Sequence, residues 1–224
     1  MALLSIIVPC YNEEATVSAF YARASAVCAA LEGVETEFLF VDDGSADGTL
    51  DIVRRLAADH AGVRWLSFSR NFGKEAAMYA GLEHARGDLA AVMDVDLQDP
   101  PELLPELLEA VESGEYDCAA VRRVDRKGEP PIRSWCARQF YKLINRVSRT
   151  EIVDGARDFR LMTRQMVDAI LRLGEYNRFS KGIFSWVGFR TKWVETVNVE
   201  RSGGESKWSF FKLLVYALDG IIAF

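Results

Sequence analysis

Two aspartates separated by one residue, Asp94 and Asp96, directly follow an apolar stretch of the chain. That stretch, 89–93, is typical of a buried strand, in which alternate side chains point to one face, ~6.6 Å apart. Asp94, Asp96 and Gln98 would then share a face at the end of the strand. Two carboxylates and an amide oxygen suit a hard divalent cation such as Mg²⁺ or Mn²⁺. The alternative is an acidic polar turn without a ligand, and this segment alone leaves both open because short motifs often occur by chance.

The composition suits one globular domain, or one domain plus an appendage. The chain has 224 residues, of which 50% are hydrophobic and 27% charged, enough for a full core. A net charge of -6 disfavours nucleic acid as a partner. The four cysteines form no CxxC pair, which favours reduced packing residues in a cytosolic protein. The two histidines, His60 and His84, fall in surface-like helical segments, so a histidine base or a zinc site is disfavoured.

Strand-like and helix-like segments alternate along the first 122 residues, which predicts a parallel sheet with helices on both faces. The strand-like runs are 3–8, 38–41, 63–68, 89–93 and 118–121, and the helical patterns are 13–31, 49–59, 74–85 and 102–112. Such sheets bind ligands at the carboxyl ends of their strands. Polar residues follow each predicted strand, and three of these loops carry carboxylates.

Two familiar phosphate-binding motifs are absent from the sequence. It contains neither G-x-G-x-x-G nor G-x-x-x-x-G-K-[ST], which disfavours a dinucleotide oxidoreductase or a P-loop enzyme. A nucleotide bound at this edge would need a metal to neutralise its phosphates. The missing motifs therefore favour a cation at Asp94 and Asp96.

A basic segment, 122–149, interrupts the alternation with nine lysines and arginines against two acidic residues. Within it, 132–147 has apolar residues at helical spacing beside a stripe of Arg138, Lys142 and Arg146. A basic amphipathic helix can lie on a membrane surface, although a helix packed on the domain with a solvated charged face is the commoner arrangement.

The last third of the chain predicts two more strands, 158–162 and 191–199, then a cationic loop and an apolar tail. The tail from residue 213 is shorter than the ~20 residues that cross a bilayer. We expect it to precede a membrane segment of a longer protein, and the alternative is a terminal helix packed on the core.

Four motifs in order along the chain resemble those of family-two, GT-A-fold inverting glycosyltransferases of the polyprenyl-phosphate subgroup. They are Pro9-Cys-Tyr-Asn-Glu-Glu, Val41-Asp-Asp-Gly-Ser, Asp94-Val-Asp-Leu-Gln-Asp-Pro-Pro and Asp158-Phe-Arg-Leu-Met. Two further stretches, 177–182 and 186–189, resemble the bacterial bactoprenol branch more than the dolichyl-phosphate mannose synthases. Several motifs in order are far more specific than one, and here they span the whole chain.

The resemblance implies a fold and a domain organisation. The fold is a Rossmann-like α/β GT-A domain whose mostly parallel sheet has helices on both faces, followed by amphipathic membrane-proximal helices. The catalytic domain would cover 1–206, with 122–149 facing the acceptor and the membrane. A juxtamembrane helix, 207–224, would precede transmembrane helices.

The resemblance also implies roles for individual residues. Asp158 and Asp96 would be catalytic, with Asp158 at the position usually assigned as the base, and Mg or Mn would be bound by Asp94, Asp96 and Gln98. The nucleotide sugar would contact Pro9, Tyr11, Glu13, Asp42, Asp43, Lys74, Asp94 and Arg122. The acceptor phosphate would contact Arg133, Arg138, Arg201 and Lys207.

The implied activity is transfer of a hexose, with inversion, from a nucleotide sugar to undecaprenyl (bactoprenyl) phosphate. UDP-glucose is the favoured donor, and the implied place is the cytoplasmic face of the bacterial inner membrane, where the full-length protein could self-associate. A phosphate acceptor is mostly ionised at neutral pH, since its second pKa is ~6, so Asp158 could orient groups without acting as a base.

Other functions remain open alternatives: a GDP-mannose-dependent transferase, a soluble transferase with a hydroxyl acceptor, and a non-catalytic membrane-associated scaffold. A processive polysaccharide synthase is disfavoured because none of Gln98, Gln139 and Gln165 begins a Q-x-x-R-W motif.

Overall fold

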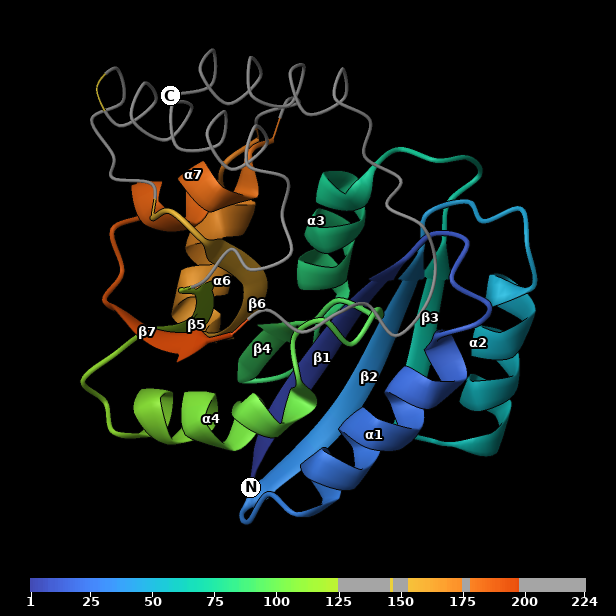
Figure 1. Cartoon of the computed structure of the whole chain (residues 1–224), viewed down its shortest axis with the longest axis horizontal. Coiled ribbons are helices and arrows are strands. Elements are labelled where there is room, and N and C mark those ends of the chain that lie inside the picture. The colour runs from blue at the N-terminus through green and yellow to red at the C-terminus, as the bar shows by residue number, and fades with distance from the viewer. Residues whose placement is uncertain (125–145, 147–152, 175–177, 198–224) are drawn as a thin grey trace.

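The computed structural model describes residues 1–124, 146, 153–174 and 178–197. Within them a seven-stranded sheet has the order β3-β2-β1-β4-β6-β5-β7 (Figure 1). The strands are β1 (Ala2–Cys10), β2 (Val34–Asp42), β3 (Val63–Ser67), β4 (Leu89–Val92), β5 (Cys118–Arg123), β6 (Ala156–Thr163) and β7 (Thr191–Thr196). The helices are α1 (Val17–Ala29), α2 (Thr49–Asp59), α3 (Lys74–His84), α4 (Leu104–Glu112), α6 (Arg164–Leu171) and α7 (Ser180–Trp186).

The sheet is mostly parallel, as predicted, and β6 is its antiparallel strand. β6 lies between β4 and β5 and pairs antiparallel with both, whereas the other neighbouring strands run parallel. The amino end of β6 therefore lies at the same edge as the carboxyl ends of β4 and β5. Val92 of β4 pairs with Arg160 of β6. Beyond this pair, Asp94 and Asp158 lie near each other at that edge, where both contact Lys74.

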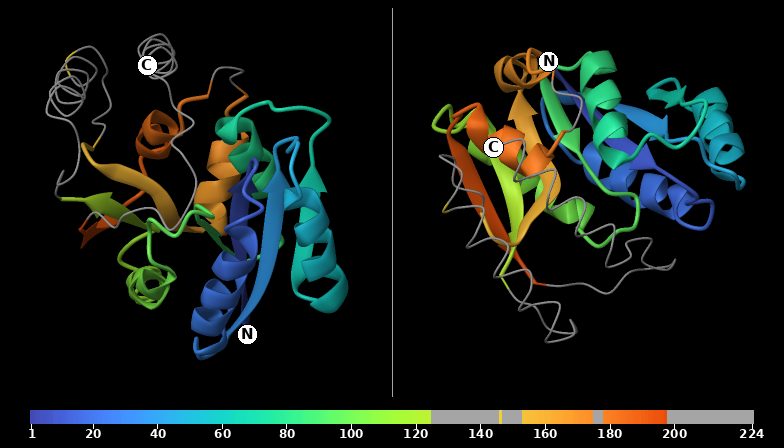
Figure 2. Two further views of the ribbon diagram at one scale, coloured as in Figure 1. Left: turned by 45° about the vertical axis from the view of Figure 1, so that its right-hand side comes forward. Right: turned by 90° about the horizontal axis from the view of Figure 1, so that it is seen from above.

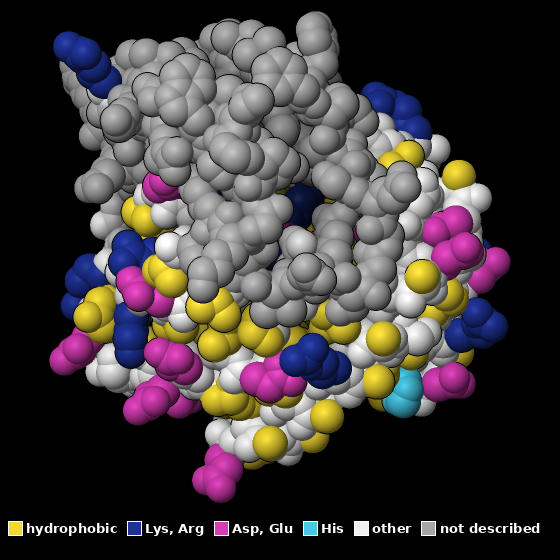
Figure 3. Space-filling model, in the orientation of Figure 1, with side chains coloured by type: hydrophobic (Ala, Val, Ile, Leu, Met, Phe, Trp, Pro, Cys, Tyr) yellow, Lys and Arg dark blue, Asp and Glu magenta, His cyan; other side chains and the backbone are white. Residues whose placement is uncertain are grey.

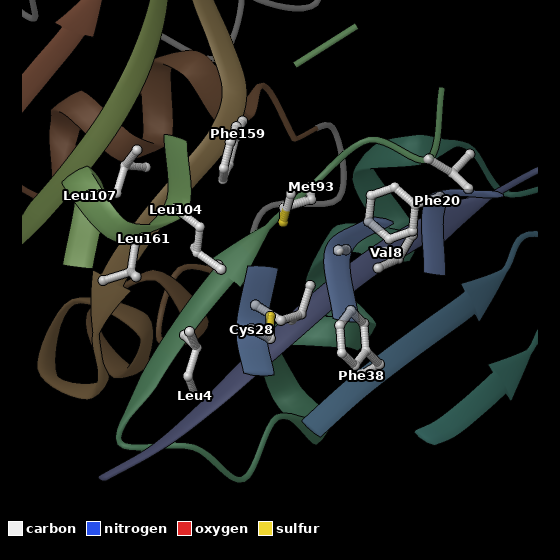
Figure 4. Packing of buried hydrophobic residues seen from close by; sticks show 14 of the residues in the cluster. Leu4, Val8, Phe20, Cys28, Phe38, Met93, Leu104, Leu107, Phe159 and Leu161 are labelled. Atoms are coloured by element: carbon white, nitrogen blue, oxygen red, sulfur yellow. The ribbon is translucent and has the colours of Figure 1, made fainter. Parts of the chain in front are cut away.

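Helices cover both faces of the sheet, which confirms the prediction (Figure 2). Alternate strand residues supply the two cores: Ile6 belongs to the cluster that contains residues of α1, α2 and α4, and Ile7 to the cluster under α3, α6 and α7. Figure 4 shows the first cluster, where Phe20 of α1 and Leu104 of α4 pack toward the strands. Hydrophobic packing on both faces of the sheet holds the strand ends in fixed relative positions.

Two predicted helix starts were too early. The helix predicted from residue 13 begins at Val17, because Asn12 has a positive φ of 52° and Glu13 still belongs to the loop after β1. The helix predicted from residue 102 begins as a 3-10 turn over Pro101–Leu103, and α4 follows with Pro105 in its first turn. Proline is tolerated at such a position because the N–H that it lacks would have had no hydrogen-bond partner within the helix.

Three of the four cysteines, Cys10, Cys28 and Cys118, are buried thiols in packing positions, and Cys136 lies outside the described residues. Over the coloured part of Figure 3, acidic and basic side chains are interspersed over the surface. No helix in the described ranges is long and apolar enough to cross a membrane. Apart from residue 146, the predicted 132–147 and 207–224 helices lie outside those ranges.

A buried carboxylate on β2 forms hydrogen bonds with neighbouring segments of the chain. Glu37 on β2 is 6% exposed and accepts hydrogen bonds from Ser5 Oγ at 2.6 Å, the Arg86 N–H at 2.9 Å and Arg64 Nη1 at 3.0 Å. Burial alone would raise the pKa of Glu37, but these donors outweigh it and lower the pKa. The ionised form is therefore the one that the fold stabilises.

Replacing Glu37 with glutamine is expected to lower the free energy of unfolding by ~1–3 kcal/mol at pH 7, because charged hydrogen bonds are lost in a buried place. Since the folded pKa is depressed, the wild-type advantage is present above the unfolded pKa of ~4.3 and disappears as pH falls through the folded value. Urea unfolding at pH 7 and pH 3 measures this. Glu35→Gln, on the same strand but exposed, is the control and should change little.

Candidate active site

The loops after β1 and β2 lock together at the carboxyl edge of the sheet. The Asn12 N–H donates to Ser45 Oγ at 2.9 Å, and Asn12 Oδ1 accepts from the Ala46 N–H at 2.8 Å. A carboxylate oxygen of Glu14 accepts from the Gly48 N–H at 2.7 Å. The two loops therefore form one rigid wall, which includes the predicted nucleotide residues Tyr11 and Glu13.

Asp42 is the last residue of β2 and Asp43 is the first residue after it, and both are buried. Asp42 is 1% exposed and accepts from the Ser45 N–H at 3.2 Å and from Ser67 Oγ at 2.9 Å. Asp43 accepts from the backbone N–H groups of Phe72 at 2.7 Å and Gly73 at 2.9 Å, and burial raises its pKa. These bonds position the loops around the site. The predicted nucleotide contacts of both residues stay predictions.

Gly44 allows the β2 loop to pass against the β3 loop. Its φ is +67°, and a Cβ atom there would lie 2.4 Å from the backbone carbon of Arg70. Any side chain would therefore push the two loops apart.

The acidic segment after β4 does not continue the strand, so the prediction of an alternating strand face was wrong. β4 ends at Val92, and a turn follows in which Leu97 has a positive φ of 58°. Asp96 is 6% exposed, and its Oδ1 accepts from the Gln98 N–H at 3.1 Å. The carboxylates of Asp94 and Asp96 are thus presented by a compact turn.

Lys74, the first residue of α3, joins two carboxylates. Its Nζ lies 2.6 and 2.8 Å from the two oxygens of Asp94 and 2.5 Å from Asp158 Oδ2. Burial alone would lower the pKa of Lys74, but the two negative charges outweigh it and raise the pKa. Burial would likewise raise the pKa of Asp158, yet the charges of Lys74, Lys181 and Arg160 hold it well below the ordinary value. The site contains a carboxylate held ionised by neighbouring cations.

Arg157, from β6, holds the acidic turn. Its Nε donates to Asp99 Oδ1 at 2.8 Å and its Nη2 to Gln98 Oε1 at 3.3 Å. Asp99 is 2% exposed, and its burial outweighs the attraction of Arg157 and raises its pKa to about 6. Among the described residues the second oxygen of Asp99 has no hydrogen-bond partner. Arg157 therefore fixes the turn that carries the predicted metal ligands.

Replacing Arg157 with methionine is expected to lower the free energy of unfolding by ~3–5 kcal/mol, because a buried Asp99 loses its partner. Adding Asp99→Asn should restore part of that loss. Thermal and urea unfolding measure both effects. Arg190→Met, which breaks an exposed pair with Asp117, should cost under ~1 kcal/mol. Equal losses in the Arg157 and Arg190 variants would contradict the role given to Arg157.

A second group of contacts places α7 beside β6. Arg160 is 2% exposed, and its Nη2 donates to the Arg157 carbonyl at 2.9 Å. Its guanidinium carbon lies 3.6 Å from the ring centroid of Phe184. The carboxylate of Glu75 on α3 accepts from the N–H and the hydroxyl of Ser180. These contacts hold Lys181, which follows Ser180, near enough to Asp158 for its charge to lower the pKa of Asp158.

The structure brings together only part of the predicted site. Lys74, Asp94 and Asp158 meet directly, and Arg157 joins Gln98 to the same group. Pro9 is buried within β1, and Arg122 on β5 pairs with Glu195 of β7. The predicted acceptor residues lie outside the described ranges: Arg133, Arg138, Arg201 and Lys207. Arg157 and Lys181 were absent from the predicted set, although Lys181 stands in the 177–182 stretch and Arg157 directly precedes the Asp158 motif.

The residues after β4 fit a divalent cation that shares its ligands with a diphosphate. Asp94, Asp96 and Gln98 offer hard oxygen donors, which suit Mg²⁺ and Mn²⁺. Within the described residues, no three His, Cys, Asp or Glu side chains gather closely enough to hold a metal by themselves. Mg²⁺ in phosphate-transfer sites is commonly held by one or two carboxylates plus substrate phosphates, which is what this turn can supply.

Comparison with known proteins shows the family of this chain. The model of glycosyl transferase family 2 matches residues 5–171, so the chain belongs to that family. It is 44% identical over 221 residues to the bactoprenol glucosyl transferase of Shigella phage SfV, covering 99% of this chain and 71% of that protein.

Two solved structures share the fold. Mannosyl-3-phosphoglycerate synthase from Rubrobacter xylanophilus matches 99% of this chain and 72% of its own, with a TM-score of 0.65 and 20% identity. Glucosyl-3-phosphoglycerate synthase from Mycobacterium tuberculosis, in complex with Mn²⁺ and UDP-glucose, matches 97% of this chain and 76% of its own, with a TM-score of 0.61 and 18% identity. The chain is a glycosyltransferase with a GT-A fold.

Proposed function

We propose that this protein transfers a hexose from a nucleotide sugar, UDP-glucose first, to polyprenyl phosphate with inversion at the anomeric carbon. The observation that carries the acceptor class is the ion pair between Lys74 and Asp158. A carboxylate held ionised by adjacent cations is a poor proton acceptor, whereas a phosphomonoester acceptor has already lost its proton at neutral pH. Bactoprenol is the acceptor in the name of the phage relative, which supports the lipid.

The donor half of the reaction uses the loops after β1, β2 and β4. The rigid wall after β1 and β2 would bind the nucleoside, and Asp94 and Asp96 would hold the divalent cation. When bound, that cation neutralises the charge that builds up on the leaving diphosphate. Arg157 keeps the turn in place while this happens.

The acceptor half uses the cations around Asp158. A phosphate oxygen attacks the anomeric carbon from the face opposite the leaving group, so a carbon–oxygen bond to the lipid phosphate forms. The bond to the nucleoside diphosphate breaks, and the diphosphate takes its electron pair. No proton needs to be removed from the acceptor, so the residues only have to position it. Lys181 and Lys74 are the described cations best placed to do so.

In this proposal, the basic segment and the tail would face the membrane. Arg133 and Arg138 of the basic segment, with Arg201 and Lys207, would attract the phosphate headgroup and anionic lipids at the cytoplasmic face of the inner membrane. Self-association of the full-length protein stays a further expectation.

A donor panel tests the proposal. The protein is incubated with a short polyprenyl phosphate, Mn²⁺ and either UDP-glucose, UDP-galactose or GDP-mannose, and the anomeric configuration of the lipid product is determined by NMR. We expect UDP-glucose to give the highest kcat/KM and a product with inverted configuration. A preference for GDP-mannose would select the alternative donor, and retained configuration would contradict inversion. Nucleotide binding without any turnover would support a non-catalytic scaffold.

A further inference from the structure

Lys74 occupies an unusual place for a cation. It is the first residue of α3, after Gly73 with a φ of +100°, and the bonds from Asp43 to the Phe72 and Gly73 N–H groups hold that turn. The amino end of a helix carries partial positive charge, so a lysine there is disfavoured unless anions compensate. The compensating anions are Asp94 and Asp158, which come from two different strand ends.

The same ammonium keeps the two carboxylates in one arrangement. Asp94 contributes both oxygens at 2.6 and 2.8 Å, and Asp158 one oxygen at 2.5 Å, so the described contacts already occupy the donor capacity of Lys74. Side-chain exposures of 31% for Lys74, 24% for Asp94 and 17% for Asp158 place this cluster partly out of water. Without the ammonium, two nearby negative charges would repel each other across a medium that screens them poorly.

Asp94 is also one of the two carboxylates that fit a divalent cation. A carboxylate whose two oxygens both contact an ammonium cannot bind a metal until it releases at least one of them, and a second cation there would repel the first. Lys74 and the metal would therefore compete for the carboxylate of Asp94, while Asp158 can keep its contact with Lys74.

We propose that Lys74 is a positioning residue that competes with the divalent cation for Asp94 and, once the cation has taken Asp94, holds Asp158 and an oxygen of the acceptor phosphate. Metal binding would thus free one N–H of Lys74 on the acceptor side. The acceptor part of this inference rests on the proposed function, whereas the competition for Asp94 does not. Lys74 would then have a role other than that of a nucleotide ligand.

The test compares Lys74→Met, Lys74→Arg and the wild type. Binding of Mn²⁺ is followed by electron paramagnetic resonance without nucleotide, and UDP binding by calorimetry at saturating Mn²⁺. With its competitor removed, Lys74→Met should bind Mn²⁺ about 3- to 10-fold more tightly. Its kcat with polyprenyl phosphate should fall about 10- to 100-fold, because the acceptor side loses its orientation. Lys74→Arg should return Mn²⁺ affinity to the wild-type value and restore part of kcat.

Lys192→Met, which removes a lysine from the edge strand β7, is the matched control and should change neither quantity. Melting temperatures identify variants that fail to fold, and Lys74→Gln replaces Lys74→Met if that variant unfolds. Weaker UDP binding with unchanged Mn²⁺ affinity would overturn the inference and make Lys74 a nucleotide ligand. Tighter Mn²⁺ binding in a protein whose wild type does not use polyprenyl phosphate would refute the proposed function and leave the competition intact.

Discussion

Replacing Asp96 with alanine is expected to lower kcat for sugar transfer by at least ~1000-fold, or ~4 kcal/mol of transition-state stabilisation. Asp96 is nearly buried in the turn after β4 and already accepts one bond from the Gln98 N–H, so its position is fixed before any ligand arrives. Its loss removes one of two carboxylates that fit the cation, and within the described residues its neighbours Asp94 and Asp99 are already paired with Lys74 and Arg157.

Initial rates with a saturating donor and titrated Mn²⁺ measure this effect. The matched control is Asp51→Ala on α2, whose side chain is 79% exposed and which should keep wild-type rates. Full activity of the wild type in excess EDTA would contradict both the metal and the role of Asp96.

Replacing Asp158 with asparagine is expected to lower kcat about 10- to 100-fold while leaving the acidic limb of the pH profile in place. The pKa of Asp158 is depressed, so this carboxylate stays ionised as pH falls through the range where enzymes are assayed. The group that titrates there is the acceptor phosphate, with a second pKa of ~6. The rate should therefore fall tenfold per pH unit below ~6 in both proteins.

Profiles of kcat/KM for the acceptor between pH 4.5 and 8 distinguish this from base catalysis. If Asp158 were the general base, its loss would lower the rate far more than 100-fold across the whole pH range. Asp154→Asn, a nearby change in the segment before β6, is the control for a lost negative charge.

Much of the architecture could be predicted from local patterns, because buried parallel strands and their covering helices have distinct periodicities. The strands near residues 3, 38, 63, 89 and 118 are confirmed, with helices on both faces. The place of β6 could not be predicted, since β6 inserts between β4 and β5 through pairings between residues far apart in sequence. Nothing in the composition of 156–163 distinguishes an antiparallel central strand from a parallel edge strand.

The site, like the fold, could be predicted only in part. The sequence indicated which loops meet, because the carboxyl ends of parallel strands share an edge. It could not indicate that Lys74 lies between Asp94 and Asp158, or that Arg157 holds Asp99, since these contacts span 20 to 84 residues. The strand-face argument for Asp94, Asp96 and Gln98 failed because β4 is only four residues long and turns immediately after Val92. The three predicted ligands still lie in one segment, the turn after β4.

The choice of acceptor is the central claim, and a competition assay tests it most directly. The protein is given labelled UDP-glucose, Mn²⁺ and equal amounts of a short polyprenyl phosphate and the corresponding polyprenol, and the label in each lipid is counted after chromatography. Because the described site holds Asp158 as a carboxylate beside Lys74, we predict label on the phosphate and none on the alcohol. Label on the alcohol at a comparable rate would show that a base removes the acceptor proton, and would contradict the account.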